Sequence, residues 1–212
     1  MALKSLTMPL QLGGPALAGC LLLAGAAFAE TPCSTRYDEA RKTRSEAASS
    51  AAASECGALA KRGDPLGQLN LGLLKLDGIG MPQDVAGGVE LVRAAADAGL
   101  AAAQTRLGRM HLRGDGVAAD LGTAAEWFER AANGGDPLAQ YELGQLRYTG
   151  LGIARDNYEA YRWFSAAAAN FARLGNEPRR KLAERKQASA AAQLPAEERA
   201  RADRWVAEQL AR

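Results

Sequence analysis

The sequence contains few of the residues from which catalytic and metal sites are usually built. It has one histidine, His111, and three cysteines in 212 residues. Zinc sites and catalytic triads need further ligands or bases at a defined spacing. The chain has no Cys-x-x-Cys pair and no His-Glu-x-x-His, Gly-x-Ser-x-Gly or Ser-x-x-Lys motif. We therefore predict that the protein is not an enzyme and has no catalytic residue, metal site or cofactor.

Strong net charge and aromatic side chains are also scarce. The formal net charge is +2, and Phe, Trp and Tyr together make up 6% of the residues. A chain with so little excess positive charge lacks the basic surface by which proteins bind nucleic acids, so we expect no nucleic-acid partner. Abundant alanine and few aromatic residues favour closely packed helices over sheets.

Long apolar runs are missing except near the N-terminus. The run Ala16 to Phe28 follows the basic residue Lys4 and ends at the small-x-small site Ala27-Phe28-Ala29. This arrangement is typical of a secretory signal over residues 1–29, cleaved after Ala29. The run is shorter than a membrane-spanning helix. We therefore expect a periplasmic or secreted protein with no membrane span after cleavage.

Two features of the cysteines leave alternatives open. Leu17-Ala18-Gly19-Cys20 resembles the bacterial lipobox, in which Cys20 would be acylated and anchor a lipoprotein to the membrane. Cleavage after Ala29 would instead leave Cys33 and Cys56, an even number in an oxidising compartment. These two could form a disulfide that ties the N-terminal segment to the first helices. They could equally be two unpaired thiols, because geometry decides whether a bridge forms.

A block of residues recurs three times at a constant interval. Leu71-Gly72 returns as Leu107-Gly108 and Leu143-Gly144, and both intervals (108 − 72 and 144 − 108) equal 36. The same interval relates Gly78/Gly80 to Gly114/Gly116 and Gly150/Gly152, Asp84 to Asp120 and Asp156, and Leu91 to Trp127 and Trp163. A period of this size predicts an all-α fold, a right-handed α-solenoid of stacked antiparallel helix pairs.

The ends of the helices are marked by local signals. Asp64-Pro65 and Asp136-Pro137 pair an N-cap residue with proline at the first helical position. The glycine pairs that follow allow positive φ in the turn after the first helix of each unit. The three repeated aspartates are expected to begin the second helix. Glycine in the middle of the first helix, as at Gly108, costs stability, and close approach of the second helix's backbone is the expected reason.

These signals predict the domain organisation. A signal peptide (1–29) is followed by an N-terminal helical cap or degenerate repeat (30–63), with one helical run from Tyr37 to Lys61 that Ser34 or Thr35 could cap. Three repeats follow at 64–99, 100–135 and 136–170. Residues 171–212 form C-terminal capping helices, where the pattern departs from the repeat and Phe171 replaces the expected glycine.

The repeated pattern resembles that of a known family. The stretch Leu107-Gly108-Arg109-Met110, then Gly114-Asp115-Gly116, Asp120, and Ala124-Ala125-Glu126-Trp127-Phe128 through Ala131-Ala132, is similar to the Sel-one-like repeat family, relatives of the tetratricopeptide repeats. The resemblance covers residues 64–169 and implies a helical solenoid. By analogy with tetratricopeptide repeats, the first helices of the units would line a groove.

The analogy predicts the residues of a binding groove. Equivalent positions form rows of residues spaced by 36, and basic residues lie beside tyrosines in the second and third repeats. The predicted partner-binding residues are Arg109, His111, Arg113, Tyr141, Gln145, Arg147 and Tyr148. The alternative is that Leu76, Leu112 and Tyr148 form core between repeats while the basic side chains are simply solvated.

The function that we predict is an exported, non-enzymatic scaffold or adaptor that binds a protein or peptide in this groove. A first alternative is a cell-wall-associated enzyme or a binder of peptidoglycan fragments. A second is a structural lipoprotein subunit of an envelope or secretion complex, which would require acylation of Cys20. The identity of the partner does not follow from the residues.

Overall fold

The computed structural model describes residues 33–211, and within this part the chain forms ten helices and no strand. The predicted signal segment and Cys20 lie outside the described residues. The helices are α2 (Cys33–Thr43), α3 (Glu46–Lys61), α4 (Pro65–Asp77), α5 (Val85–Asp97), α6 (Ala101–Arg113), α7 (Leu121–Asn133), α8 (Pro137–Thr149), α9 (Asn157–Arg173), α10 (Glu177–Ala191) and α11 (Ala196–Leu210).

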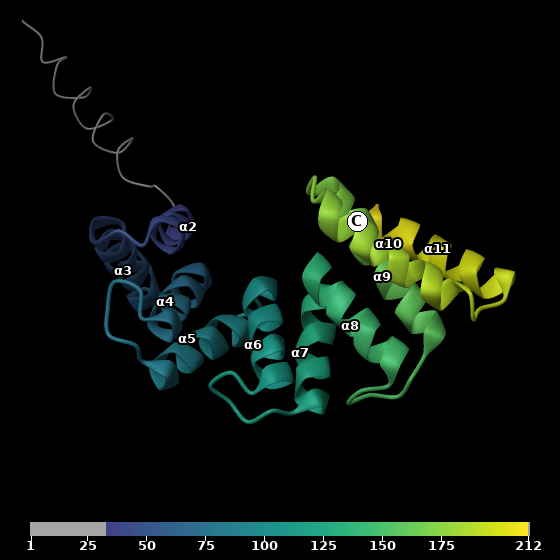
Figure 1. The fold of residues 1–212 in the computed structure, drawn as a ribbon, viewed down its shortest axis with the longest axis horizontal. Helices are drawn as coiled ribbons and strands as arrows, with labels where there is room; N and C mark the ends of the chain where they lie inside the picture. The colour runs from purple at the N-terminus through teal and green to yellow at the C-terminus, as the bar shows by residue number, and fades with distance from the viewer. Residues whose placement is uncertain (1–32, 212) are drawn as a thin grey trace, which may run out of the picture. The chain divides into compact units, whose positions relative to one another are not determined.

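The helices pack as successive pairs. Within the three central pairs α4 packs on α5, α6 on α7 and α8 on α9, and between pairs α5 packs on α6 and α7 on α8 (Figure 1). Each helix therefore contacts mainly its neighbours in the chain, which is the arrangement of an α-solenoid. The predicted all-α solenoid of helix pairs is confirmed.

The first helix of a pair begins and ends as the local signals predict. The Asp64 side chain accepts a hydrogen bond from the backbone N–H of Gly67 at 2.7 Å, with proline in the first turn of α4. Asp136 caps α8 in the same way. All three first helices end at a glycine with left-handed φ, which is 64°, 78° and 77° at Gly78, Gly114 and Gly150.

The second helix of each pair begins at the repeated aspartate. Asp84, Asp120 and Asp156 accept hydrogen bonds from the backbone N–H three residues later, at 2.9, 3.0 and 3.0 Å. The backbone N–H of each aspartate also donates to a carbonyl near the end of the preceding helix, on Lys75, His111 and Arg147 respectively. The loop between the helices of a pair is thereby closed in the same way three times.

The glycines in the middle of the first helices lie where the two helices of a pair approach most closely. A Cβ at Gly72 would lie 2.9 Å from the backbone oxygen of Gly88, which matches the expected backbone approach. At Gly108 and Gly144 the nearest atoms instead belong to the rings of Phe128 and Phe164, at 2.8 and 2.9 Å. The later two repeats therefore use the space for an aromatic ring.

The second glycine of each turn joins neighbouring pairs. A Cβ at Gly80 would collide with the backbone of Ser49, one at Gly116 would lie 2.9 Å from Val85 Cγ1, and one at Gly152 would lie 2.5 Å from Leu121 Cβ. The three contacted residues are themselves 36 apart (85 − 49 and 121 − 85). Helix α3 thus contacts the first pair as α5 and α7 contact the pairs that follow them.

The N-terminal part contains two helices where the sequence indicated one helical run. The helix is interrupted at Arg44, whose φ is 52°. Helix α3 then begins at Glu46 after the N-cap Ser45, whose side chain accepts a hydrogen bond from the backbone N–H of Ala48. Ser34 and Thr35 lie inside α2 and do not cap a helix that starts at residue 37. The local cap at Ser45 is the reason for the difference, because it begins a new helix within the run.

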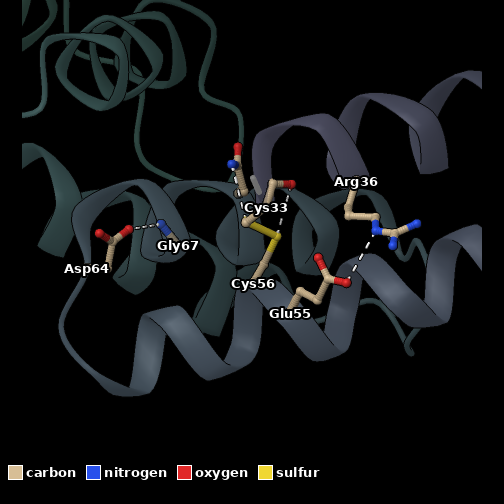
Figure 2. Close-up of a disulfide and its surroundings, with 7 residues drawn as sticks. Cys33, Arg36, Glu55, Cys56, Asp64 and Gly67 are labelled. Atoms are coloured by element: carbon tan, nitrogen blue, oxygen red, sulfur yellow. Dashed lines mark hydrogen bonds and ion pairs between the residues drawn. A yellow bond between two sulfur atoms is a disulfide. The ribbon is translucent and has the colours of Figure 1, made fainter. Parts of the chain in front are cut away.

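Cys33 and Cys56 are joined by a disulfide, and this connects α2 to α3 (Figure 2). The Asn70 side chain of α4 donates a hydrogen bond through Nδ2 to Cys33 Sγ at 3.4 Å. Arg36 Nε also donates to Glu55 Oε1 at 3.2 Å between α2 and α3. The first three helices are therefore held together by covalent and polar contacts around a small apolar cluster.

The C-terminal departure from the repeat is an insertion of one helical turn. Helix α9 has 17 residues where α7 has 13. The glycine that ends the unit is Gly175, with φ of 65°, and it lies 40 residues after Gly135 (175 − 135), so four residues have been added. Phe171 thus lies within the lengthened α9, and α10 begins at the N-cap Asn176. Helix α11 then packs on α9, with the Trp205 ring 5.1 Å from that of Trp163.

Candidate partner-binding site

A pocket of about 190 Å³ lies where α6, α8, the end of α9 and α10 meet. We name it the Glu142 pocket after the one carboxylate that lines it. Its walls combine two arginines, a tyrosine and four residues that are apolar or acidic: Arg109, Leu138, Tyr141, Glu142, Phe171, Arg179 and Leu182. The first helices of two repeats and the capping helix therefore contribute to one site.

The added turn of α9 places an aromatic residue in this pocket. The Phe171 carbonyl accepts the backbone N–H of Asn176, as the Ala131 carbonyl accepts that of Asp136 in the preceding repeat. Phenylalanine thus replaces alanine at the turn, and its ring is buried at 3% exposure against a cluster that includes Tyr141. The Arg179 guanidinium lies 5.9 Å from the centre of the Phe171 ring.

The charges of three arginines act on the half-buried carboxylate of Glu142. Burial raises the pKa of Glu142, while Arg109, Arg113 and Arg179 lower it, and burial is the largest of these influences. The side chain of Glu142 is 19% exposed, and its Oε1 lies 3.7 Å from Arg109 Nε. That distance is beyond a hydrogen bond. The buried Nε of Arg109 has no hydrogen-bond partner in the part of the chain that the structure describes.

The pocket therefore carries an excess of positive charge. Two arginines and one carboxylate line it, and the charges of Arg113 and Arg185 outside the lining act on Glu142 and on Tyr141 respectively. Burial is the main cause that raises the pKa of the Tyr141 hydroxyl, followed by the charge of Glu142. A site with this balance attracts a group that is negatively charged.

The structure brings two of the seven predicted partner-binding residues, Arg109 and Tyr141, to this pocket. Arg113 does not line it, but its charge lowers the pKa of Glu142. Tyr148 is partly buried and packs against an apolar cluster that includes residues of α9 and α10. This is closer to the alternative interpretation, in which Tyr148 belongs to the core between repeats. Gln145 lies on α8, as Tyr148 does, and is half-buried. Its Oε1 has no hydrogen-bond partner among the described residues.

The other two predicted residues, His111 and Arg147, lie at the loops of their own helix pairs. His111 Nδ1 is 3.3 Å from the carbonyl oxygen of Ala118 in the loop, and its own carbonyl accepts the N–H of Asp120. The Arg147 carbonyl accepts the N–H of Asp156 in the same way. In the first pair, the equivalent Lys75 reaches Asp84 with Nζ, 2.7 Å from Oδ2. Burial raises the pKa of Glu159, in the first turn of α9, and the charge of Arg147 is among those that lower it. The three basic side chains therefore act near the start of the second helix of their own pair.

Five residues of the pocket were not predicted from the sequence: Leu138, Glu142, Phe171, Arg179 and Leu182. The last two belong to the capping helix, where the 36-residue period no longer applies. Adding 36 to a residue number in α8 gives a position in α10 that is one helical turn away from the structurally equivalent one. The inserted turn of α9 makes the true interval between equivalent residues 40 at this point. The only available signal was the displaced glycine at Gly175.

A second pocket, of about 280 Å³, lies between the turn after α7, the end of α9 and α11. Trp163, Trp205, Gln140 and Asn170 are among its lining residues. The two amides already bind each other, because Asn170 Nδ2 donates to Gln140 Oε1 at 3.0 Å and Gln140 Nε2 donates to the Ala132 carbonyl at 3.2 Å. Its polar groups are therefore used internally, and the Glu142 pocket is the better candidate.

Two kinds of feature are absent from residues 33–211. No group of three or more histidine, cysteine or acidic side chains there is arranged to hold a metal ion. No helix in that part is both long and apolar enough to cross a membrane.

Comparisons with known proteins agree with the repeat pattern. The sequence profile of the Sel1 repeat matches residues 65–100, 101–136 and 137–170. The crystal structure of a Sel1 repeat protein from Oxalobacter formigenes is 37% identical, with a TM-score of 0.55, and the match covers 61% of this chain and 94% of that one. No curated protein sequence matches the chain.

A second solved structure matches nearly the whole chain. It is the crystal structure of c5321, a protective antigen present in uropathogenic Escherichia coli strains that displays an SLR fold. The two are 29% identical, with a TM-score of 0.61. The match covers 91% of this chain but 44% of that protein, so the chain spans less than half of this relative.

Proposed function

Because the chain belongs to the Sel1 repeat family, and membership of that family suggests a scaffold for protein–protein interactions, we propose that the chain binds another protein at the Glu142 pocket. The observation that carries this proposal is a pocket in which two arginines lie with one half-buried carboxylate, beside apolar walls. Arginine and tyrosine are enriched among the residues that contribute most to protein interfaces. Tyr141 and Arg109 are such residues, and both are partly accessible.

The helices at the two ends support the scaffold as caps. We infer that α2 and α3 are a degenerate first unit, since α3 contacts Gly80 as α5 and α7 contact the equivalent glycines. At the other end, α10 and α11 cover α9 with surfaces rich in charged residues. Terminal units of a solenoid need a polar outer face for solubility. The three repeats, residues 64–170, then present the partner-binding helices.

We further propose that the protein is exported. The signal-like pattern over residues 1–29 and the disulfide between Cys33 and Cys56 support this, because disulfides persist in oxidising compartments. Intact mass spectrometry of the native protein, with and without reduction, tests both features. A chain that starts at Glu30 and gains the mass of two hydrogens on reduction is expected. A lipid-modified start at Cys20 would instead favour the lipoprotein alternative, and an uncleaved chain would contradict export.

Cross-linking in envelope extract tests the scaffold proposal. The pocket variant combines Arg109→Glu with Arg179→Glu. The control variant combines Arg62→Glu with Arg93→Glu, which makes the same change in charge at exposed positions outside the pocket. We expect the wild type and the control to cross-link the same protein, and the pocket variant to lose it. The pocket variant should melt at a lower temperature than the control, because the new carboxylates lie near Glu142, but its circular dichroism should show that it is folded. Equal capture by a folded pocket variant would contradict the assignment of the site.

A further inference from the structure

We propose that the Glu142 pocket binds an acidic segment within the partner chain, with a side-chain carboxylate held between Arg109 and Arg179. An apolar side chain next to that acid would pack in the same pocket, against Leu138, Phe171 and Leu182. This inference rests on the proposed function and specifies the chemistry of the segment that is bound.

The first support is the charge balance of the pocket. Arg109 and Arg179 line the pocket with a single carboxylate, so one positive charge among the lining residues remains uncompensated by Glu142. The side chain of Arg109 is 29% exposed and that of Glu142 is 19% exposed, so both are partly shielded from water. Charges in such a setting interact more strongly than charges on an open surface. A carboxylate from a partner would restore the balance, whereas an ammonium group would increase the imbalance.

The second support is the unused hydrogen-bonding capacity of Arg109. Its Nε lies 3.7 Å from Glu142 Oε1, which is too far for a hydrogen bond, and this buried donor has no partner among the described residues. A buried donor without an acceptor costs free energy. An arginine can bind a carboxylate through two parallel N–H groups. The exposed 29% of the Arg109 side chain lies on atoms other than the buried Nε, and a partner carboxylate would bind Arg109 there.

The third support is the spread of the positive charges over two helices. Arg109 is on α6 and Arg179 is on α10, and both line the pocket together with residues of α8. A single chain terminus would offer one carboxylate at one point. An internal segment that crosses α8 can place acidic side chains near both helices, so we commit to an internal segment as the occupant.

Glu142 has a specific role in this arrangement. Its carboxylate lines the pocket with Arg109 and Arg179, 3.7 Å from Arg109 Nε, and repels a second carboxylate. At a separation of about 6 Å and an effective dielectric constant of about 40, the repulsion between two unit charges corresponds to a factor of about ten in affinity. Replacement by the neutral, similarly shaped glutamine should therefore strengthen the binding of an acidic segment. A pocket that selected a basic segment through Glu142 would show the opposite result.

The test uses four fluorescein-labelled octapeptides and the purified full-length protein, with binding measured by fluorescence anisotropy at low salt. The acidic probe has two glutamates, each next to a leucine, and an amidated C-terminus. The neutral probe replaces the glutamates by glutamine, the basic probe replaces them by lysine, and the fourth is the neutral probe with a free C-terminal carboxylate. The protein variants are Arg109→Gln, Glu142→Gln and, as a matched control, Arg93→Gln, which removes an exposed charge outside the pocket.

We expect the acidic probe to bind the wild type and the control equally. Arg109→Gln should weaken that binding at least tenfold, whereas Glu142→Gln should tighten it about tenfold. Added salt should weaken it. Melting curves of both pocket variants should show a folded protein. Glu142→Gln is expected to fold well, because it removes a charge that burial disfavours.

Four results would overturn the inference. They are weaker binding of the acidic probe by Glu142→Gln, tighter binding of the basic probe than of the acidic one, equal binding of the neutral probe with a free C-terminus, and no binding of any probe. The scaffold proposal is judged separately by the cross-linking experiment. Loss of the cross-linked protein in the charge-reversal variant without binding of the acidic probe would keep the site and reject the acidic segment.

Discussion

The packing of the repeats can be tested at a single glycine that has a matched control in the same chain. Gly108 lies in the middle of α6, and a Cβ there would be 2.8 Å from two ring carbons of Phe128. Gly57 lies within α3, and a Cβ there would have no atom within 4 Å. Both glycines are in α-helices, so replacement by alanine changes the helix propensity equally. The difference between Gly108→Ala and Gly57→Ala therefore isolates the contact with the ring.

The magnitudes follow from two opposing effects. Alanine in place of glycine stabilises a helix by about 1 kcal/mol. Carbon atoms pack best at about 3.5–4.0 Å, so a separation of 2.8 Å forces the Phe128 ring to move. That ring is fully buried and cannot turn out to solvent. Overpacking of this kind costs about 1–3 kcal/mol. We expect Gly57→Ala to stabilise by about 1 kcal/mol, and Gly108→Ala to be about 1–3 kcal/mol less favourable than that.

Urea denaturation followed by circular dichroism measures both variants. A third variant, Gly108→Ala with Phe128→Leu, tests the cause. The smaller side chain leaves room for the new methyl group, so the double variant should be more stable than the sum of the two single changes predicts. Equal stabilisation by Gly57→Ala and Gly108→Ala would refute the argument. Strict additivity in the double variant would show that the Phe128 ring is not the obstacle.

Three further predictions concern the core, the acidic group and the N-terminal helices. Trp163→Ala should lower the free energy of unfolding by about 3–5 kcal/mol, measured by urea denaturation, because the ring is 4% exposed. Leu91→Ala should lower it less, since that side chain is only partly buried. An equal loss in the two variants would contradict this. Burial raises the pKa of Glu142, so the folded state binds the carboxyl proton more tightly than the unfolded state does. The free energy of unfolding should therefore fall as the pH rises from the ordinary pKa of glutamate to the raised pKa of Glu142. The stability of Glu142→Gln, measured over the same pH range, should fall less, and parallel curves would refute the effect. Replacing Cys33 and Cys56 by serine should lower stability by about 3 kcal/mol, the value for a loop of roughly this length, given the 23-residue separation; an unchanged urea midpoint would contradict it.

Local signals predicted most of the repeat architecture correctly. Asp64, Asp84 and Asp136 begin helices as expected, because an N-cap depends only on the residue and on the backbone three positions later. The glycines that end the first helices were likewise predictable from their tolerance of positive φ. The break at Arg44 was missed, because the run from Tyr37 to Lys61 contains no proline and only one late glycine.

The candidate site was only partly predictable. Arg109 and Tyr141 were expected in a groove and line the Glu142 pocket. His111 and Arg147 were expected beside them, but their helix positions face the start of the second helix of the same pair. Neighbouring residues on a helix point in different directions, so a row that is close in sequence can face another surface. The period alone does not show which row faces which surface.

The sequence by itself determined the unit of this protein: its 36-residue period, the ends of its helices and the small residues where helices meet. These features depend on contacts between residues close in the chain or one unit apart. Only the tertiary structure decided where the units create a site. The Glu142 pocket joins four helices across the point where the added turn of α9 changes the register, and it buries a carboxylate among arginines from α6 and α10. The charge and shape of the pocket arise from burial and from contacts between residues that are far apart in the sequence. The repeat pattern of the sequence specifies neither of them.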